Sequence, residues 1–125
     1  MPQKILIVDD DLYLRELYEE ILKDAGYDVE TAINGEEGLT KLLSTSYNLA
    51  LLDVMMPKLD GVGVLTKLKQ TETYTLNTPI VILTNLSHDP ILDQAKQLGA
   101  TAYLIKEEMV PAELIEKIKD RKSVV

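Results

Sequence analysis

Residues 49–52 form a short, uninterrupted apolar run that ends at a single carboxylate, Asp53. Pro57 and the pair Asp60-Gly61 follow soon afterwards and favour a turn. A run of this length without polar alternation predicts a strand that is buried on both faces. Ligands bind beyond the carboxyl ends of the strands in open parallel sheets, so Asp53 stands where a site is expected. Taken alone, an acid at this position can be a helix cap, a metal ligand or a nucleophile.

Apolar runs and helical segments alternate along the whole chain. The predicted strands cover residues 4–8, 27–33, 49–52, 80–83 and 102–105. Apolar residues at helical spacing follow each of them, and these helices are expected to begin near Leu12, Glu36, Gly61, Ile91 and Pro111. Such alternation predicts a parallel sheet with helices on both faces. Five strands are too few for a closed barrel. We therefore expect an α/β fold, a doubly wound (βα)5 three-layer sandwich with the flavodoxin-like strand order 2-1-3-4-5.

Length and charge limit the kind of protein. The chain of 125 residues suits one domain, which we expect over residues 1–122, with 123–125 as a tail or the start of a linker. The net charge of −8 disfavours direct binding of nucleic acid, because phosphate contacts need clustered Lys and Arg. The absence of cysteine excludes a thiol nucleophile and thiolate metal ligands. We find no membrane span and no export signal, so we expect a cytoplasmic protein without a membrane partner.

Several polar residues near the predicted helices have simple structural interpretations. Asp11 is well placed to cap the first helix, and Gly26 to end it in the left-handed conformation. The pair Asn34-Gly35 is expected to turn the chain. The single histidine, His88, is interpreted as an exposed residue without a catalytic role. These residues are therefore not counted among the candidates for chemistry.

Polar side chains that can carry chemistry follow the predicted strands. Asp9 and Asp10 end the first strand, Asp53 the third, Thr84 the fourth and Lys106 the fifth. In the order 2-1-3-4-5 the first and third strands are neighbours, so their three carboxylates converge. Three carboxylates this close need a counter-charge, and Mg²⁺ suits a site with few carboxylates and several waters. With a hydroxyl and an ammonium alongside, the arrangement is that of a phosphoryl-transfer site, in which a carboxylate can attack phosphorus.

These residues are similar to those of a known family. The chain resembles the receiver domain, or CheY-like domain, of two-component response regulators over nearly its whole length. The resemblance rests on Asp9-Asp10-Asp11 after Val8, on residues 52–57 with Asp60-Gly61, and on Thr84, Tyr103 and Lys106. Each motif alone is weak, but the ordered set is highly specific.

The resemblance implies a role for each site residue. Asp53 would accept a phosphoryl group from a histidine kinase or phosphotransfer protein. Mg²⁺ would be bound by Asp10, by Asp53 and by the backbone carbonyl of Met55, with Asp9 acting indirectly through water. Lys106 would contact the aspartate and then the phosphoryl oxygens. The protein would not otherwise be an enzyme, apart from catalysing its own phosphoryl transfer and a slow autodephosphorylation.

The resemblance also implies a switch. Thr84 would move toward the phosphoryl group and let Tyr103 turn inward. This motion would remodel the surface around the fourth helix and fifth strand and so control a downstream protein or a fused output domain.

The chain departs from the family pattern near the site. Glu107 follows the lysine where proline is usual, and Asn85 stands where a small residue is common. Met55 and Leu86 flank the expected path of the attacking water, and neither can orient it. These apolar side chains predict slow self-dephosphorylation. Glu107 and Asn85 keep a second interpretation open, that of a degenerate receiver acting as a phosphorylation-independent binding module.

Two enzyme or cofactor classes fit the residues less well. Haloacid dehalogenase-type phosphatases carry a second aspartate two residues after the nucleophile, where this chain has Met55. A flavodoxin has a hydroxyl- and glycine-rich phosphate loop after its first strand. Here Asp9, Asp10 and Asp11 occupy that position and would repel phosphate.

Overall fold

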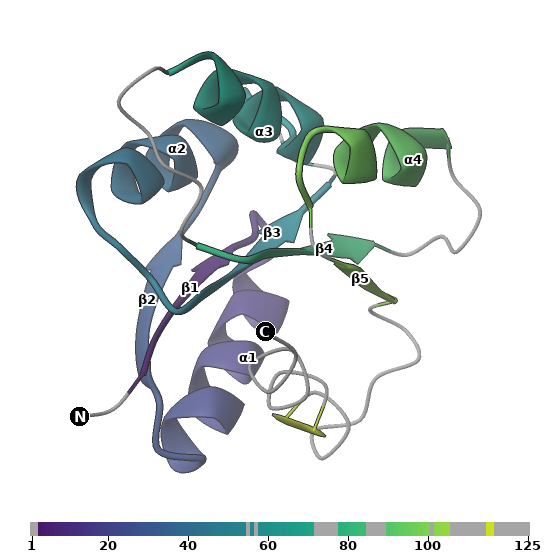
Figure 1. The fold of residues 1–125 in the computed structure, drawn as a ribbon. Helices are drawn as coiled ribbons and strands as arrows, with labels where there is room; N and C mark the ends of the chain where they lie inside the picture. The colour runs from purple at the N-terminus through teal and green to yellow at the C-terminus, as the bar shows by residue number, and fades with distance from the viewer. Residues whose placement is uncertain are drawn as a thin grey trace.

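The fold is a five-stranded parallel sheet with helices on both of its faces (Figure 1). The computed structural model describes residues 3–54, 56, 58–71, 78–84, 90–100, 102–105 and 115–116. Its elements are, in order, β1 (Lys4–Val8), α1 (Leu12–Asp24), β2 (Asp28–Ala32), α2 (Gly35–Ser44), β3 (Leu49–Asp53), α3 (Gly61–Gln70), β4 (Ile80–Thr84), α4 (Pro90–Gln97) and β5 (Ala102–Ile105). The strand order is β2-β1-β3-β4-β5 and every pairing is parallel. The predicted fold class and strand order are confirmed.

Each face of the sheet has its own apolar core. Helices α2, α3 and α4 cover one face and α1 lies against the other (Figure 1). Side chains alternate between the faces along each strand, so Leu6 and Leu52 pack under α2–α4 while Ile7 and Leu51 pack against α1. All five residues of β3 and of β4 are buried. This explains why these strands are apolar up to their last residue, Asp53 or Thr84.

Side-chain caps determine where the helices begin. Asp11, Asn34 and Asp60 accept hydrogen bonds from the first-turn amides of α1, α2 and α3, as residues at such positions commonly do. Gly26 has a φ of 96°, as expected for a residue just beyond the end of a helix. The Asn34-Gly35 pair differs from the prediction of a simple turn, because Asn34 is the cap and Gly35 is already the first residue of α2.

Other element boundaries differ from the predicted ones by one or two residues. β2 is shorter than the predicted 27–33, while β3 and β4 each include the polar residue expected just beyond them, Asp53 and Thr84. The final helix expected from Pro111 lies outside the described residues, except for 115–116, which are helical.

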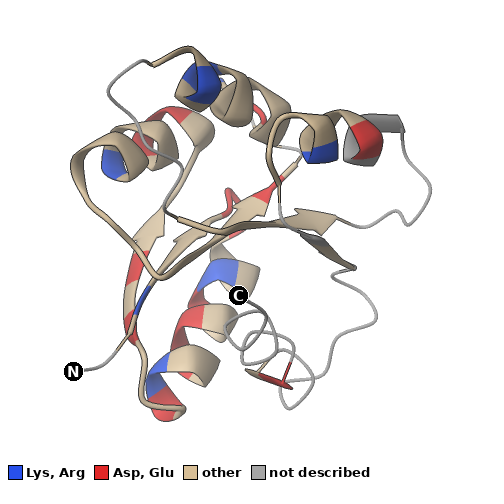
Figure 2. Cartoon of the chain, viewed as in Figure 1, with Lys and Arg blue, Asp and Glu red and all other residues tan. Residues whose placement is uncertain are grey.

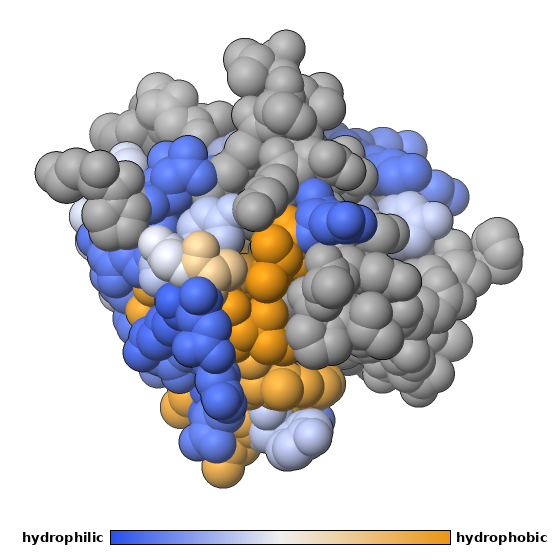
Figure 3. All heavy atoms as spheres, turned by 90° about the horizontal axis from the view of Figure 1, so that it is seen from below, coloured by the Kyte–Doolittle hydropathy of each residue, from blue (hydrophilic) through white to orange (hydrophobic). Residues whose placement is uncertain are grey.

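The surface is mixed in charge. Acidic and basic residues are interspersed along the described helices (Figure 2), so the net charge of −8 is not gathered on one of them. Seen from the side on which α1 lies, hydrophilic residues border one side of a narrow apolar band (Figure 3). Among the described residues, no helix is long and apolar enough to cross a lipid bilayer.

Candidate functional site

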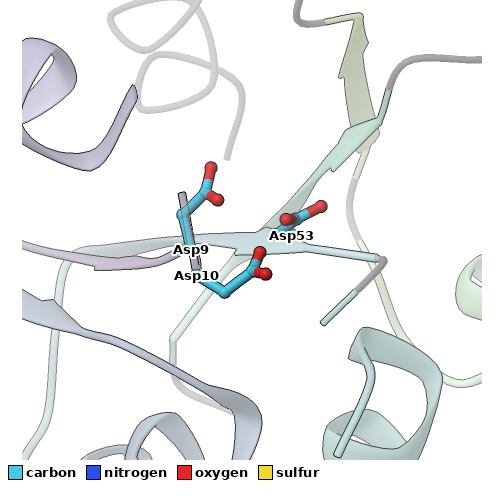
Figure 4. A group of neighbouring side chains, drawn as sticks. All are labelled: Asp9, Asp10 and Asp53. Atoms are coloured by element: carbon cyan, nitrogen blue, oxygen red, sulfur yellow. The ribbon is translucent and has the colours of Figure 1, made fainter. Parts of the chain in front are cut away.

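Three carboxylates meet at the carboxyl edge of the sheet. Asp9 and Asp10 follow β1, and Asp53 is the last residue of β3. Val8 pairs with Leu52 across these strands, so the two ends lie side by side. Each aspartate offers one oxygen such that these atoms all lie within 4.8 Å of one another (Figure 4). The sequence-based prediction that the three acids converge is confirmed.

The three acids differ in exposure. Asp9 and Asp53 are buried, with 0% and 5% of their surfaces exposed, whereas Asp10 is exposed. Figure 4 shows the Asp10 carboxylate directed toward Asp53, while the side chain of Asp9 projects from the strand end in a different direction. The cluster therefore has a buried base and a side that is open to solvent.

The turn between β1 and α1 is held by hydrogen bonds to Asp9. Its Oδ1 accepts from the backbone amide of Asp11 over 3.0 Å, and its backbone amide donates to the carbonyl oxygen of Ala32 over 3.2 Å. The Nη1 of Arg15 donates to the carbonyl oxygen of Asp9 over 2.8 Å. Asp9 is thus fixed by its own turn, by β2 and by α1. This arrangement orients the neighbouring Asp10.

Asp53 is held by the sheet and by the turn that follows it. The amide of Val54 donates to the carbonyl oxygen of Leu83 in β4 over 3.2 Å. The amide of Gly61 donates back to the carbonyl oxygen of Val54 over 3.0 Å, and a Cβ on Gly61 would lie 2.8 Å from the carbonyl oxygen of Asp53. The cap of α3 is Asp60, whose Oδ1 accepts from Gly63. Asp53 therefore does not cap that helix, which leaves the metal-ligand and nucleophile interpretations.

The loop between β3 and α3 packs closely against α2. A Cβ on Gly35 would overlap the backbone carbonyl of Leu59, so only glycine leaves room for this approach. In the same loop Lys58 has a φ of 68°, in the left-handed region that non-glycine residues seldom occupy. The close packing of Gly35 against Leu59 braces the loop that connects Asp53 to α3.

Thr84 and Tyr103 lie on the same face of the sheet. Thr84 ends β4 beside the end of β3 and is 6% exposed. Tyr103 in β5 pairs with Ile82, two residues before Thr84 on that face, and packs half-buried against the core under α2–α4. Thr84 therefore ends the strand next to Asp53, and Tyr103 lies one strand further along on the same face.

The remaining predicted site residues cannot be placed. Met55 and Lys106 lie outside the described residues, as do Asn85, Leu86, His88 and Glu107. Their roles remain predictions.

The chemistry of the acid cluster suits a small, hard cation. Its side-chain donors are carboxylate oxygens, the ligand type that Mg²⁺ prefers, and the exposed side leaves room for the waters that this ion retains. An acid held at the end of a buried strand, with a hydroxyl on the adjacent strand, can also act as a nucleophile toward phosphorus.

Comparison with known proteins identifies the family. A sequence profile described as "Response regulator receiver domain" matches residues 5–119. The chain belongs to this family. Phosphorylation-dependent switching is the general function of receiver domains.

Individual relatives agree with this assignment. The transcriptional regulatory protein CpxR homolog of Haemophilus influenzae is 44% identical over 116 residues, which cover 93% of this chain and 48% of that protein. The probable transcriptional regulator ycf27 of Cyanophora paradoxa is 41% identical over 117 residues, covering 94% and 47%. The chemotaxis response regulator CheY4 of Vibrio cholerae has a similar structure, with a TM-score of 0.86, 31% identity and coverage of 96% and 98%. The chain spans about half the length of these two curated relatives.

Three contacts around the site were not predicted from the sequence. These are the hydrogen bond from Arg15 to Asp9, the close approach of Gly35 to Leu59, and a contact between Lys96 and the ring of Tyr103. The only available signal for the first was a basic residue one turn after an acidic strand end. Gly35 and Leu59 are distant in sequence, and the contact of Lys96 with Tyr103 depends on the connection between α4 and β5. No local sequence pattern indicates either contact.

Proposed function

We propose that this chain is a phosphorylation-activated signalling switch that accepts a phosphoryl group on Asp53 from a histidine kinase or phosphotransfer protein in the cytoplasm. The observation that carries the proposal is the cluster of Asp9, Asp10 and Asp53 at the carboxyl edge of the sheet. Membership of the receiver family supports the same reaction.

The cluster has the donors for Mg²⁺. Asp10, Asp53 and the backbone carbonyl of Met55 would bind the ion directly, and Asp9 indirectly through water. When bound, the ion would neutralise negative charge on the acids and on the phosphoryl oxygens. Asp9 also keeps a structural task, since its Oδ1 is already used in the turn to Asp11.

The protein's own residues perform the transfer. A carboxylate oxygen of Asp53 attacks phosphorus and forms an O–P bond, while the P–N bond of the donor phosphohistidine breaks and its electron pair stays on the imidazole. The hydrogen bonds that hold the backbone after Asp53 would limit the directions from which its carboxylate can attack. The proposed task of Lys106 is to balance charge on the phosphoryl oxygens. Apart from this transfer and a slow autodephosphorylation, we propose no enzymatic activity.

The output is a change of surface. The hydroxyl of Thr84 donates a hydrogen bond to a phosphoryl oxygen, and Tyr103 turns toward the space that Thr84 leaves. Their positions on adjacent strands, on the face that α4 covers, support this coupling. The affected surface, around α4 and β5, would contact a downstream protein or a fused output domain. Two relatives named as transcriptional regulators make control of transcription a reasonable output to test.

A small phosphodonor tests the reaction directly. Acetyl phosphate with Mg²⁺ is expected to add the mass of one phosphoryl group to the wild-type chain and none to Asp53→Asn. The isosteric amide preserves the shape of the site, so loss of the mass gain would reflect loss of the Asp53 carboxylate, which serves both as the nucleophile and as a Mg²⁺ ligand. Absence of any gain in the wild type, with Mg²⁺ binding also absent, would favour the degenerate receiver, although the intact acid cluster argues against it.

A further inference from the structure

A lysine of α4 lies over the ring of Tyr103. The Nζ of Lys96 is 5.4 Å from the centroid of that ring. This distance is within the range of a cation–π interaction, in which an ammonium is attracted to the negative face of an aromatic ring. Lys96 is exposed and Tyr103 is half-buried, so the ring is held at the rim of the core.

The backbone around Lys96 is anchored, and this fixes the position from which the lysine side chain extends. The preceding residue, Ala95, is 1% exposed and packs into the core under α4. The carbonyl oxygen of Ala95 accepts a hydrogen bond from the amide of Ala100 over 2.9 Å, which ties the end of α4 to the chain that leads into β5. Lys96 is therefore presented beside Tyr103 by two anchored segments.

Lys96 forms no ion pair in the described part of the chain. The ion pairs found there join Lys4 to Glu30, Lys23 to Glu19 and Lys41 to Glu37, and none includes Lys96. Within the described residues, the ammonium of Lys96 thus interacts with the ring of Tyr103.

We propose that Lys96 is a clamp that holds Tyr103 in its outward position and so sets how readily this receiver switches. The proposal rests on the proposed function, because it assumes that phosphorylation of Asp53 draws Tyr103 inward past Thr84. In this proposal the half-buried position of Tyr103 is the outward one, and the contact with Lys96 breaks when the ring turns inward. It therefore stabilises the unphosphorylated conformation and must be lost on activation.

The size of the effect follows from linkage. A cation–π contact at an exposed site shifts a two-state equilibrium by about two- to five-fold. A ligand that binds only the inward conformation has an apparent dissociation constant inversely proportional to the population of that conformation. Removal of the clamp should therefore tighten binding of a phosphoryl mimic by about two- to five-fold.

The test uses trifluoroberyllate, a mimic of the phosphoryl group, in the presence of Mg²⁺. Lys96→Met keeps the length and much of the apolar stem but removes the charge. Lys96→Arg keeps a cation over the ring. Carbon-13-labelled tyrosine gives NMR signals for the six tyrosines, and Tyr103→Phe identifies the signal of Tyr103. The Tyr103 signal of the free protein reports the position of its ring. Titration with trifluoroberyllate reports the apparent affinity for this mimic.

Lys96→Met is expected to shift the Tyr103 signal of the free protein and to lower the half-saturating concentration of trifluoroberyllate by about two- to five-fold. Lys96→Arg should resemble the wild type. In a Tyr103→Leu background, Lys96→Met should change nothing, because the ring that it acts on is gone.

Two results would overturn the clamp while leaving the proposed function intact. One is normal binding with no difference between Lys96→Met and the wild type. The other is an equal effect of Lys96→Met in the Tyr103→Leu background. Failure of every variant to bind, the wild type included, would contradict the proposed function itself and the clamp with it.

Discussion

The guanidinium of Arg15 reaches back from α1 to the end of β1, where its Nη1 donates a hydrogen bond to the backbone carbonyl oxygen of Asp9 over 2.8 Å. This bond spans the turn from which Asp9 and Asp10 project. It therefore connects the orientation of α1 to the geometry of the acid cluster.

Loss of the Arg15 side chain should weaken Mg²⁺ binding. Two effects oppose each other in Arg15→Met: the turn becomes freer, and a positive charge near the acids disappears. We expect the first to dominate because the charge is partly exposed and screened by salt. The affinity for Mg²⁺, measured by calorimetry, should fall about tenfold, as for other residues that orient metal ligands. Arg15→Lys, which keeps the charge but not the planar group, serves as control. Unchanged or tighter binding in Arg15→Met would show that Arg15 does not position the acids.

Neighbouring aspartates should separate function from stability. Asp11→Ala removes the cap of α1 and should lower the free energy of unfolding by about 1 kcal/mol. Asp10→Ala removes an exposed carboxylate from the cluster and should abolish measurable Mg²⁺ binding without lowering stability. Chemical denaturation and calorimetry of both variants test this. The prediction fails if Asp11→Ala loses the metal as completely as Asp10→Ala does.

Gly35 should tolerate no side chain. In Gly35→Ala the new Cβ overlaps the backbone carbonyl of Leu59, so either α2 or the β3–α3 loop must move. We expect a loss of about 1–3 kcal/mol in the free energy of unfolding, as for other overpacked sites. Phosphorylation by acetyl phosphate should also become slower.

Gly63→Ala is the matched control for this variant. Its Cβ would meet the terminal Cδ1 of the same Leu59, a flexible side-chain atom that can move aside. Its cost should therefore be the smaller of the two. Equal losses in the two variants would argue against a special role for the backbone contact.

Tyr47 should make the fold sensitive to alkaline pH. It is 4% exposed, and its hydroxyl donates to Oε1 of Glu30 over 2.8 Å. Burial, this hydrogen bond and the negative charge of Glu30 raise the pKa of Tyr47 above its ordinary value of 10.0. Above pH 10.0 the unfolded chain releases this proton while the folded chain keeps it. The contribution to stability is thus complete below that pH and falls as the pH rises toward the folded pKa.

The comparison with Tyr47→Phe isolates this contribution. At neutral pH the wild type should be more stable by about 1 kcal/mol, because the variant loses the hydrogen bond to Glu30. Above pH 10.0 the advantage should shrink. Denaturation of both proteins across this pH range measures the difference. A difference that does not change with pH would contradict the assignment.

Local patterns were sufficient to predict the architecture. Uninterrupted apolar runs such as residues 49–52 predicted buried parallel strands, and the order of those strands then placed Asp9, Asp10 and Asp53 at one edge. The prediction succeeded because in a parallel sheet the ends of neighbouring strands must meet. The pairing of neighbouring strands thus connects the sequence pattern to the position of the acids.

Contacts that depend on three-dimensional shape were not predictable. The fit of Gly35 against Leu59 depends on the path of the β3–α3 loop, which no periodicity specifies. The contact of Lys96 with Tyr103 depends on the rotamers of two side chains on different elements. Asn34 was misjudged for a related reason, since a turn signal and a helix cap use the same residue type.

The most direct test of the central claim is the location of the phosphoryl group. After incubation with acetyl phosphate and Mg²⁺, borohydride reduction converts an aspartyl phosphate to homoserine, which peptide mass spectrometry can locate. Conversion is expected at Asp53 and at no other acid. Conversion at Asp9 or Asp10 with Asp53 unchanged, or none at any acid, would contradict it.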